Sequence, residues 1–307
     1  MHRLSIRHND SSIRRELLKE KLKSSTLLLD GATGTELERR GVDISLPLWS
    51  ARAILDAPEI LMQIHLDYLL AGANIITANT FRTHRHNLAS SGMGDQAKSM
   101  THQAVAIAQK AVRFSKNNST FVAGSIAPLE DSYAPQKTLS ESVLKEEHTL
   151  MSNILVSSGV DLLLVETMNT ILEATIATRA AISTGCTTFT SLVCDRYGSL
   201  LSGESLHDAT ASLLPLKPHA ILINCTSAPD VLTPLENLRK RTNLPIGAYA
   251  NVGYLNEQKH WVQTEAVNPD SYAEHALNWS KAGATLIGGC CGTQPDHIDT
   301  IRKLLSL

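Results

Sequence analysis

Eight short runs of apolar and β-branched residues recur along the chain, and a longer segment with helical periodicity follows each of them. The expected strands lie at residues 27–29, 75–77, 120–122, 162–165, 189–193, 221–223, 246–248 and 285–287. The runs are almost entirely apolar rather than alternating, which is typical of strands buried on both faces. Strands that alternate with helices in this way indicate a parallel sheet with helical crossovers.

The segments between the runs carry helix signals of their own. Residues 58–70, 95–112 and 140–156 repeat apolar side chains at helical spacing. Three further helix starts are predicted where a proline comes one or two positions after a Ser, Asn or Thr, at Pro229, Pro269 and Pro295. Proline is favourable at the start of a helix because its missing N–H would have no partner there.

Eight strand–helix units in 307 residues fit a single closed (β/α)₈ TIM barrel. A doubly wound open sheet is the alternative, but no Gly-rich phosphate turn follows the first strand. We expect the barrel over residues 26–307 and a helical extension over residues 1–25 that packs against it. An organelle transit peptide is the other interpretation of this basic segment, although Glu16 and Glu20 fit it poorly.

Composition narrows the classes of partner. The 28 Lys and Arg side chains nearly balance 30 Asp and Glu, so no overall positive field favours nucleic acid or an anionic membrane. No apolar stretch approaches the ~20 residues of a membrane span, and the first residues lack the apolar core of a secretion signal. Five cysteines, two of them adjacent, do not suggest a disulfide framework. We therefore expect a cytoplasmic protein that acts on small molecules, while the oligomeric state stays open.

Polar residues follow nearly every expected strand. They are Asp30, Asn79, Thr80, Ser125, Glu166, Thr167, Asp195, Asn224, Cys225, Asn251, Cys290 and Cys291. In a parallel barrel these positions gather on one rim, which is where such barrels carry their chemistry. The general polarity of loops explains part of this pattern, but three of the five cysteines also occur at these strand ends.

Cys225, Cys290 and Cys291 end the sixth and eighth expected strands, so they can converge. Three thiolates suit zinc, and a tetrahedral ion held by three protein ligands keeps one position open for chemistry. Glycines around the Cys290–Cys291 pair permit an irregular backbone that turns both sulfurs inward. Without the barrel, the pair would be two small buried hydrophobic residues, which is how we interpret Cys186 and Cys194.

Two carboxylates lie on the same rim. Asp30 and Glu166 suit either a cationic group or acid–base work, with helix capping as the alternative for Asp30. His84 and His86 follow the second strand with no obvious ligand partner in the sequence, so we expect ordinary surface histidines.

The motifs around these residues resemble those of the homocysteine S-methyltransferases, over residues 27–304. The matching segments are residues 30–37 (DGATGTEL), 78–81 (ANTF), 166–168 (ETM), 173–174 (EA), 224–225 (NC), 249–253 (YANVG) and 288–293 (GGCCGT). The resemblance implies a barrel with Zn²⁺ on Cys225, Cys290 and Cys291 that methylates homocysteine to methionine. It also implies that Glu166 holds the substrate amino group.

The resemblance places further residues in the site. Asp30 and Gly31 look like part of the same amino-acid pocket, and Asn251 stands where the family has a residue near the metal. A metal-bound homocysteine sulfur would be deprotonated and could attack a methyl carbon without a side-chain base.

The methyl donor is inferred from the positions at which this sequence agrees with particular members of the family and from those at which it differs. Trp49 resembles the aromatic face that betaine-using members offer a cationic methyl group, but Arg82 and Thr167 stand where those members have tyrosines. Members that use a methyl-corrin carry extra domains, for which this length leaves no room. We therefore expect a sulfonium donor, S-methylmethionine rather than S-adenosylmethionine, and Arg82 beside a cation has no explanation at this stage.

Two other functions stay open from the sequence. A zinc hydrolase would use the same metal to activate water, but such enzymes usually bind zinc through His and carboxylate ligands. A non-catalytic barrel stabilised by zinc would normally show a fourth protein ligand, and none stands out.

Overall fold

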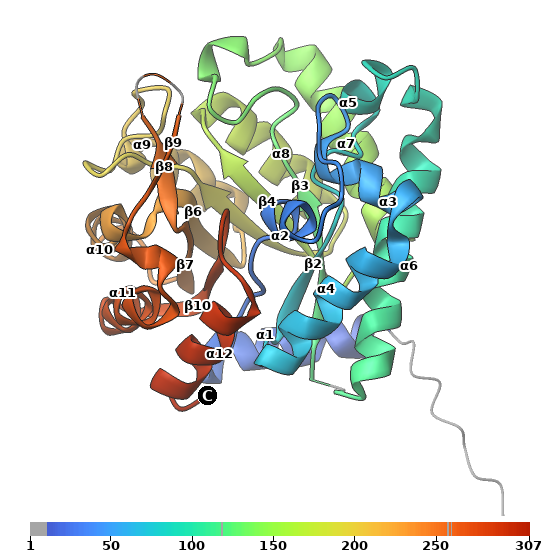
Figure 1. The fold of residues 1–307 in the computed structure, drawn as a ribbon. Coiled ribbons are helices and arrows are strands. Elements are labelled where there is room, and N and C mark those ends of the chain that lie inside the picture. Colours follow the sequence, from blue (N-terminus) through green and yellow to red (C-terminus); the bar gives the residue numbers. More distant parts are fainter. Residues whose placement is uncertain (1–10, 118, 257, 259) are drawn as a thin grey trace, which may run out of the picture.

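Eight parallel strands form one sheet that curls into a closed ring, as the spacing of the apolar runs predicts (Figure 1). The computed structural model describes residues 11–117, 119–256, 258 and 260–307. The ring strands are β1 (Leu27–Leu28), β2 (Ile75–Ala78), β3 (Phe121–Ile126), β4 (Leu162–Met168), β5 (Thr187–Leu192), β6 (Ala220–Ser227), β7 (Ile246–Asn251) and β10 (Ala284–Gly289). From β2 to β7 each strand pairs with the next along the chain, β7 pairs with β10 and β10 with β1. A parallel bridge between Leu29 and Ile75 closes the ring between β1 and β2.

Helices surround the ring. They are α2 (Gly34–Arg39), α3 (Ala53–Asp56), α4 (Pro58–Ala71), α5 (Arg85–Ala89), α6 (Ala97–Ser115), α7 (Glu141–Ser157), α8 (Ile171–Ser183), α9 (Leu206–Leu213), α10 (Leu232–Arg239), α11 (Pro269–Lys281) and α12 (Pro295–Leu304). A hairpin of β8 (Gly253–Leu255) and β9 (Trp261–Gln263) projects beyond the end of β7 (Figure 1). Among the described helices, none has the length and apolar character needed to cross a bilayer.

This architecture confirms the predicted (β/α)₈ barrel and rules out the open sheet. Pro269 and Pro295 begin α11 and α12 as expected. Pro229 does not begin a helix: it lies in a 3₁₀ turn, Ala228–Asp230, and α10 starts at Leu232. Because Ser227 still belongs to β6, the chain needs this turn to leave the barrel before a helix can form.

Side chains alternate between the inside and the outside of the ring, as strand geometry requires. In β4, Leu162 and Leu164 belong to the cluster that fills the barrel, whereas Leu163 and Val165 belong to the larger cluster under the helices. The inner cluster also takes Phe121 from β3, and the same alternation holds around the ring. The barrel interior is therefore a packed core at its lower end, and not an open channel.

An additional helix, α1 (Ser11–Ser24), covers the end of the barrel where the strands begin (Figure 1). Its Leu18 and Leu22 are buried in the inner cluster. Arg14 reaches Asp161, just before β4, with nitrogen–oxygen distances of 2.6 and 2.8 Å, and also donates to the carbonyl of Thr120. The opposite end, where the strands finish, stays open to ligands.

Candidate metal and substrate site

A layer of polar side chains replaces the apolar core at the end of the barrel where the strands finish. The inward row of β4 runs Leu162, Leu164, Glu166, so its last member is a carboxylate. The same change occurs on neighbouring strands, whose inward rows end in Thr77, Ser125, Ser191, Asn224 and Tyr249. Because strand periodicity is two, one register of the barrel delivers all of these groups to a common floor.

A cavity of about 360 Å³ opens above this floor. Its size falls in the range of small-molecule sites. Seven of the eight residues proposed from the sequence line it: Asp30, Gly31, Trp49, Glu166, Cys225, Cys290 and Cys291. The eighth, Asn251, is 1% exposed and lies behind the cysteines rather than in the cavity wall.

The three cysteines predicted as metal ligands meet at one edge of the cavity. Their sulfur atoms all lie within 4.8 Å of one another, although Cys225 lies in β6 and the other two cysteines follow β10. The Cys225 and Cys290 sulfurs are 2.7 Å apart and both are free thiols. That separation exceeds a disulfide bond of about 2.05 Å and is about 1 Å less than two thiolates keep on one tetrahedral zinc.

Irregular backbone places these sulfurs. β6 carries an extra residue relative to β7 between Asn224 and Ser227, and within this bulge Cys225 has a φ of +50°. On the other segment, Gly292 has a φ of +83°, which turns the chain directly after the adjacent cysteines. Regular strands would point neighbouring side chains to opposite faces, so these turns let adjacent residues share the site.

A matching bulge lies in β4, where Thr167 has a φ of +59°. Asn224 joins the two bulges: its Oδ1 accepts from the Thr167 N–H at 3.0 Å, and its Nδ2 donates to Thr167 Oγ1 at 2.8 Å. Ser191 also donates to Asn224 Oδ1, at 2.7 Å. The fully buried Asn224 side chain therefore stabilises the strained backbone that presents Cys225.

Asn251 connects the two segments that carry the cysteines. Its Nδ2 donates to the carbonyl of Cys225 at 2.8 Å, and its Oδ1 accepts from the N–H of Cys291 at 3.0 Å. The Tyr133 hydroxyl lies 3.3 Å from the same Nδ2. One amide side chain thus fixes the separation of the two cysteine-bearing strand ends.

The cysteine cluster fits a soft divalent metal such as zinc. Hydrogen bonds within the cluster hold the pKa of Cys291 well below its ordinary value and that of Cys290 well above it, so one sulfur of the three favours the thiolate. By contrast, burial raises the pKa of Cys186 to about 11, and Cys194 is shifted upward for the same reason. Those two cysteines are buried outside the cavity and lack thiolate character, in keeping with the interpretation of them as core residues.

Two buried carboxylates face the same cavity. Burial raises the pKa of Glu166 to about 7, against hydrogen bonds from Ser125 and from the Tyr249 hydroxyl at 3.2 Å. Burial likewise raises the pKa of Asp30 to about 7. Asp30 does not cap a helix: it accepts from the N–H of Thr77 at 2.7 Å and from its hydroxyl at 3.0 Å. A cationic ligand group would stabilise the ionised form of each buried carboxylate and would therefore bind there favourably.

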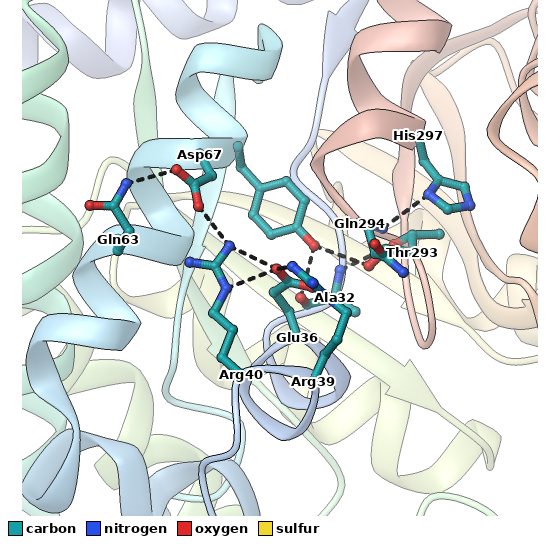
Figure 2. Close-up of polar contacts among 10 residues, drawn as sticks. Ala32, Glu36, Arg39, Arg40, Gln63, Asp67, Thr293, Gln294 and His297 are labelled. Atoms are coloured by element: carbon teal, nitrogen blue, oxygen red, sulfur yellow. Dashed lines mark hydrogen bonds and ion pairs between the residues drawn. The ribbon is translucent and has the colours of Figure 1, made fainter.

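The side chains of Tyr68 and Thr293 pack against the segment that follows Asp30. A side chain at Gly31 would lie 2.7 Å from the Tyr68 ring and 2.8 Å from Thr293 Oγ1, so only glycine fits. The Tyr68 hydroxyl lies 2.9 Å from the carbonyl of Ala32 and 3.1 Å from that of Thr293, which joins the first and last loops of the rim (Figure 2).

Ion pairs connect helix α2, which follows this segment, to α4. Glu36 is fully buried and accepts from Arg39 and Arg40, and Arg40 also contacts Asp67 on α4 at 2.6 Å (Figure 2). A buried carboxylate with two guanidinium partners is satisfied, so this cluster is a structural anchor for the loop that carries Asp30.

Aromatic side chains form the outer wall. Trp49, with a φ of +48°, packs edge-on against Phe81 with ring centroids 5.6 Å apart. Asn79 donates to the carbonyl of Ser50 at 2.7 Å and so holds the Trp49 turn against β2. Tyr133 and Tyr249 were missed by sequence reasoning. The inward position of Tyr249 in β7 was readable from strand periodicity, but no pattern in the sequence marks Tyr133.

Other sequence expectations fall outside the site. Asp195 caps a turn by accepting from the N–H groups of Tyr197 and Ser199, and it does not line the cavity. The prediction of surface histidines is wrong for His84, which is 1% exposed and packs edge-on against His148. Burial then pulls the pKa of His84 well below its ordinary value, so it stays neutral. The loop after β2 folds inward against α7, which local sequence did not reveal.

The fold and this site together define a barrel enzyme with a three-cysteine metal site beside an amino-acid-sized cavity. The family model for homocysteine S-methyltransferase matches residues 27–305. The chain is 32% identical to homocysteine S-methyltransferase 3 of Zea mays, over 91% of this chain and 90% of that protein. It is 31% identical to a selenocysteine methyltransferase of Astragalus bisulcatus, over 91% and 92%.

A solved structure supports the same family assignment. The metallated form of the homocysteine methyltransferase MmuM from Escherichia coli superposes with a TM-score of 0.81 at 29% identity, covering 94% of this chain and 99% of that one. The chain therefore belongs to the homocysteine S-methyltransferase family, which confirms the resemblance found in the sequence.

Proposed function

We propose that this chain transfers a methyl group from a sulfonium donor, S-methylmethionine, to the sulfur of homocysteine in a zinc-dependent reaction. The observation that carries the proposal is the convergence of three cysteine sulfurs with two buried carboxylates in one cavity. Cys225, Cys290 and Cys291 would hold the ion, which would keep a bound thiol deprotonated at neutral pH.

The carboxylates support an amino acid as the acceptor. Glu166 lies on the cavity floor with its charge unpaired by any described cation, so an ammonium group would lower its pKa and bind there. Asp30, held by Thr77, adds a second negative group, and Gly31 lets the substrate backbone approach closely. In the proposed pose the acceptor amino group faces Glu166 and its sulfur faces the cysteines.

Methyl transfer then balances without a side-chain base. The thiol proton of homocysteine leaves to solvent as its sulfur joins the site. A sulfur lone pair forms the new bond to the methyl carbon, and the carbon–sulfur bond of the donor breaks with its electron pair returning to the donor sulfur. Homocysteine and S-methylmethionine thus give two molecules of methionine. The barrel's contribution is alignment of the two sulfurs in one cavity.

Aromatic faces at the mouth support a cationic donor. Trp49 and Phe81 line the cavity, and sulfonium methyl groups are attracted to such rings. Position 167 carries a threonine on the strained turn next to Cys225, with Oγ1 3.8 Å from the sulfur. The ring that betaine-using members place there is therefore replaced by a short side chain, which favours a sulfonium over betaine.

The three cysteine ligands disfavour the zinc hydrolase as an alternative function. Three thiolates leave a zinc ion electron-rich and so poorly suited to acidify water, whereas they suit activation of a fourth sulfur. The relative named a selenocysteine methyltransferase supports testing selenols as acceptors too.

A donor panel tests the proposal. Zinc-loaded protein receives homocysteine with S-methylmethionine, S-adenosylmethionine, betaine or dimethylsulfoniopropionate, and methionine is measured. We expect the highest kcat/KM with S-methylmethionine. Equal rates for betaine would refute the donor assignment, and no methionine from any donor would refute the function.

A further inference from the structure

Among the residues that the structure describes, Arg82 is the one arginine that lines the site cavity, and it has no ionic partner there. Its Nε is buried without a hydrogen bond among the described residues, and no described carboxylate lies within 4.0 Å of its guanidinium. A partly buried guanidinium normally keeps a carboxylate or phosphate partner, since its five donors are costly to leave unmet. The position is therefore prepared for an anion that the chain does not supply.

Two acids on the loop after β3, Glu130 and Asp131, act electrostatically on Arg82, and each has another partner. Glu130 pairs with His86 Nε2 at 2.8 Å, and Asp131 Oδ1 accepts from the N–H of Tyr133 at 2.9 Å. Asp131 is exposed at the cavity mouth, where it also lines the cavity, and no described donor contacts its second carboxylate oxygen. The outer part of the cavity thus offers one free cation and one free carboxylate oxygen on adjacent loops.

This pair is separate from the carboxylates of the floor. Asp30 and Glu166 are hydrogen-bonded by side chains of the strands themselves, from Thr77, Ser125 and Tyr249, whereas Arg82 and Asp131 lie on the loops that follow β2 and β3. A substrate amino acid on the floor therefore leaves Arg82 and Asp131 unused. One cavity carries two sets of charged groups, and the proposed reaction brings in two amino acids.

We propose that Arg82 and Asp131 form the donor subsite, in which Arg82 binds the α-carboxylate of a sulfonium amino acid and Asp131 binds its α-ammonium. This inference rests on the proposed function and names the part of the donor that the chain recognises. It also explains a cation near a cationic donor, because the side chain of S-methylmethionine separates the carboxylate from the sulfonium. The sulfonium lies toward Trp49 and the sulfurs, and the carboxylate lies toward Arg82.

Three donors separate the two contacts. S-Methylmethionine carries both the carboxylate and the ammonium, dimethylsulfoniopropionate carries only the carboxylate, and trimethylsulfonium carries neither. Arg82→Gln should lower the kcat/KM preference for either carboxylate-bearing donor over trimethylsulfonium by about 30-fold, the equivalent of one charge-assisted contact of about 2 kcal/mol. Arg82→Lys should recover part of that preference, because it keeps the charge but not the bidentate geometry.

Asp131→Asn should lower the preference for S-methylmethionine over dimethylsulfoniopropionate by about 10-fold. Asparagine keeps the oxygen that accepts from Tyr133, so the turn survives. Arg113→Gln, on the exposed face of α6, is the matched control and should change neither preference. Equal losses for all three donors, or a rise confined to the KM for homocysteine, would overturn the subsite.

A binding measurement keeps this inference distinct from the proposed function. Calorimetric titration of zinc-loaded protein with S-methylmethionine, without homocysteine, should show binding that Arg82→Gln weakens about 30-fold. If that result holds while no donor yields methionine, the function fails and the subsite stands. If methionine forms but Arg82→Gln binds S-methylmethionine as tightly as the unmodified protein, the subsite fails and the function stands.

Discussion

Replacing Glu166 by glutamine should raise the stability of the protein while it removes acceptor binding. Glu166 is 7% exposed, and its two oxygens accept from the hydroxyls of Ser125 and Tyr249. Both hydroxyls can rotate to accept a hydrogen bond instead, so a glutamine amide fits without an unsatisfied donor. The substitution therefore removes a buried charge and little else.

The magnitude follows from the pKa of Glu166, which burial raises from 4.5 to about 7. A carboxyl whose pKa rises on folding binds its proton more tightly in the folded state. Its contribution to stability is thus complete below pH 4.5 and is lost as the pH rises through about 7. At 1.36 kcal/mol per pKa unit, the ionised group costs about 3 kcal/mol at pH 8.5 and about 1 kcal/mol at pH 5.5.

Urea unfolding of zinc-loaded protein at these two pH values measures the effect. Glu166→Gln should be more stable than the unmodified protein, and the gain should grow by about 2 kcal/mol from pH 5.5 to 8.5. Cys186→Ala, which alters a neutral buried thiol outside the cavity, should show no such growth. A pH-independent difference, or a variant that is less stable at pH 8.5, would refute the reasoning.

The same substitution should act in the opposite direction on function. If Glu166 binds the homocysteine ammonium as proposed, loss of the carboxylate leaves that ammonium unpaired in a buried site, which corresponds to a rise of about 100-fold in apparent KM. Cys186→Ala should leave that KM within about twofold, since Cys186 does not line the cavity. A purely structural Glu166 would instead lose stability and activity together, so the sign of the two effects separates the roles.

Three further changes test the metal site and the closed end of the barrel. Cys290→Ser should abolish both methyl transfer and the zinc that we propose at this site, which elemental analysis should find at one per chain in the unmodified protein; full activity in metal-free protein would contradict this. Asn251→Ala should weaken zinc binding about 10- to 100-fold in a chelator competition, because it frees both cysteine segments, and an unchanged affinity would remove that role. Arg14→Gln should lower the free energy of unfolding by about 2 kcal/mol, because Asp161 stays buried without its cation, whereas Lys19→Gln in an exposed pair should change it by less than about 0.5 kcal/mol. Equal effects of the last two substitutions in urea unfolding would contradict the burial argument.

The barrel was predictable because its evidence is repeated along the chain. Each apolar run marks a strand, and the polar residue after it marks the functional rim, so convergence of Cys225 with Cys290 followed from topology alone. The position of Glu166 was readable too, since it continues the inward row of Leu162 and Leu164. These inferences need only the two-residue period of a strand and the common direction of parallel strands.

The remaining features depend on contacts between loops, which no local pattern encodes. Arg82 looked like an unfavourable neighbour for a cationic donor until the structure showed which acids were already engaged. His84 looked like a surface residue because nothing near it in sequence reveals that α7 covers it. Side chains whose surroundings come from several distant loops keep their roles hidden until those loops are placed.

The backbone strain in the described residues is concentrated at the site cavity. Outside helix ends and the C-terminus, the described non-glycine residues with positive φ are Trp49, Thr167 and Cys225, and all three line the cavity. Glycine would relax each turn by about 1–2 kcal/mol but would remove a ring, a hydroxyl or a sulfur. Asn224 offsets part of that cost through its bonds to Thr167. The strain therefore persists because each position needs both the turn and the side chain, and a glycine can supply only the first.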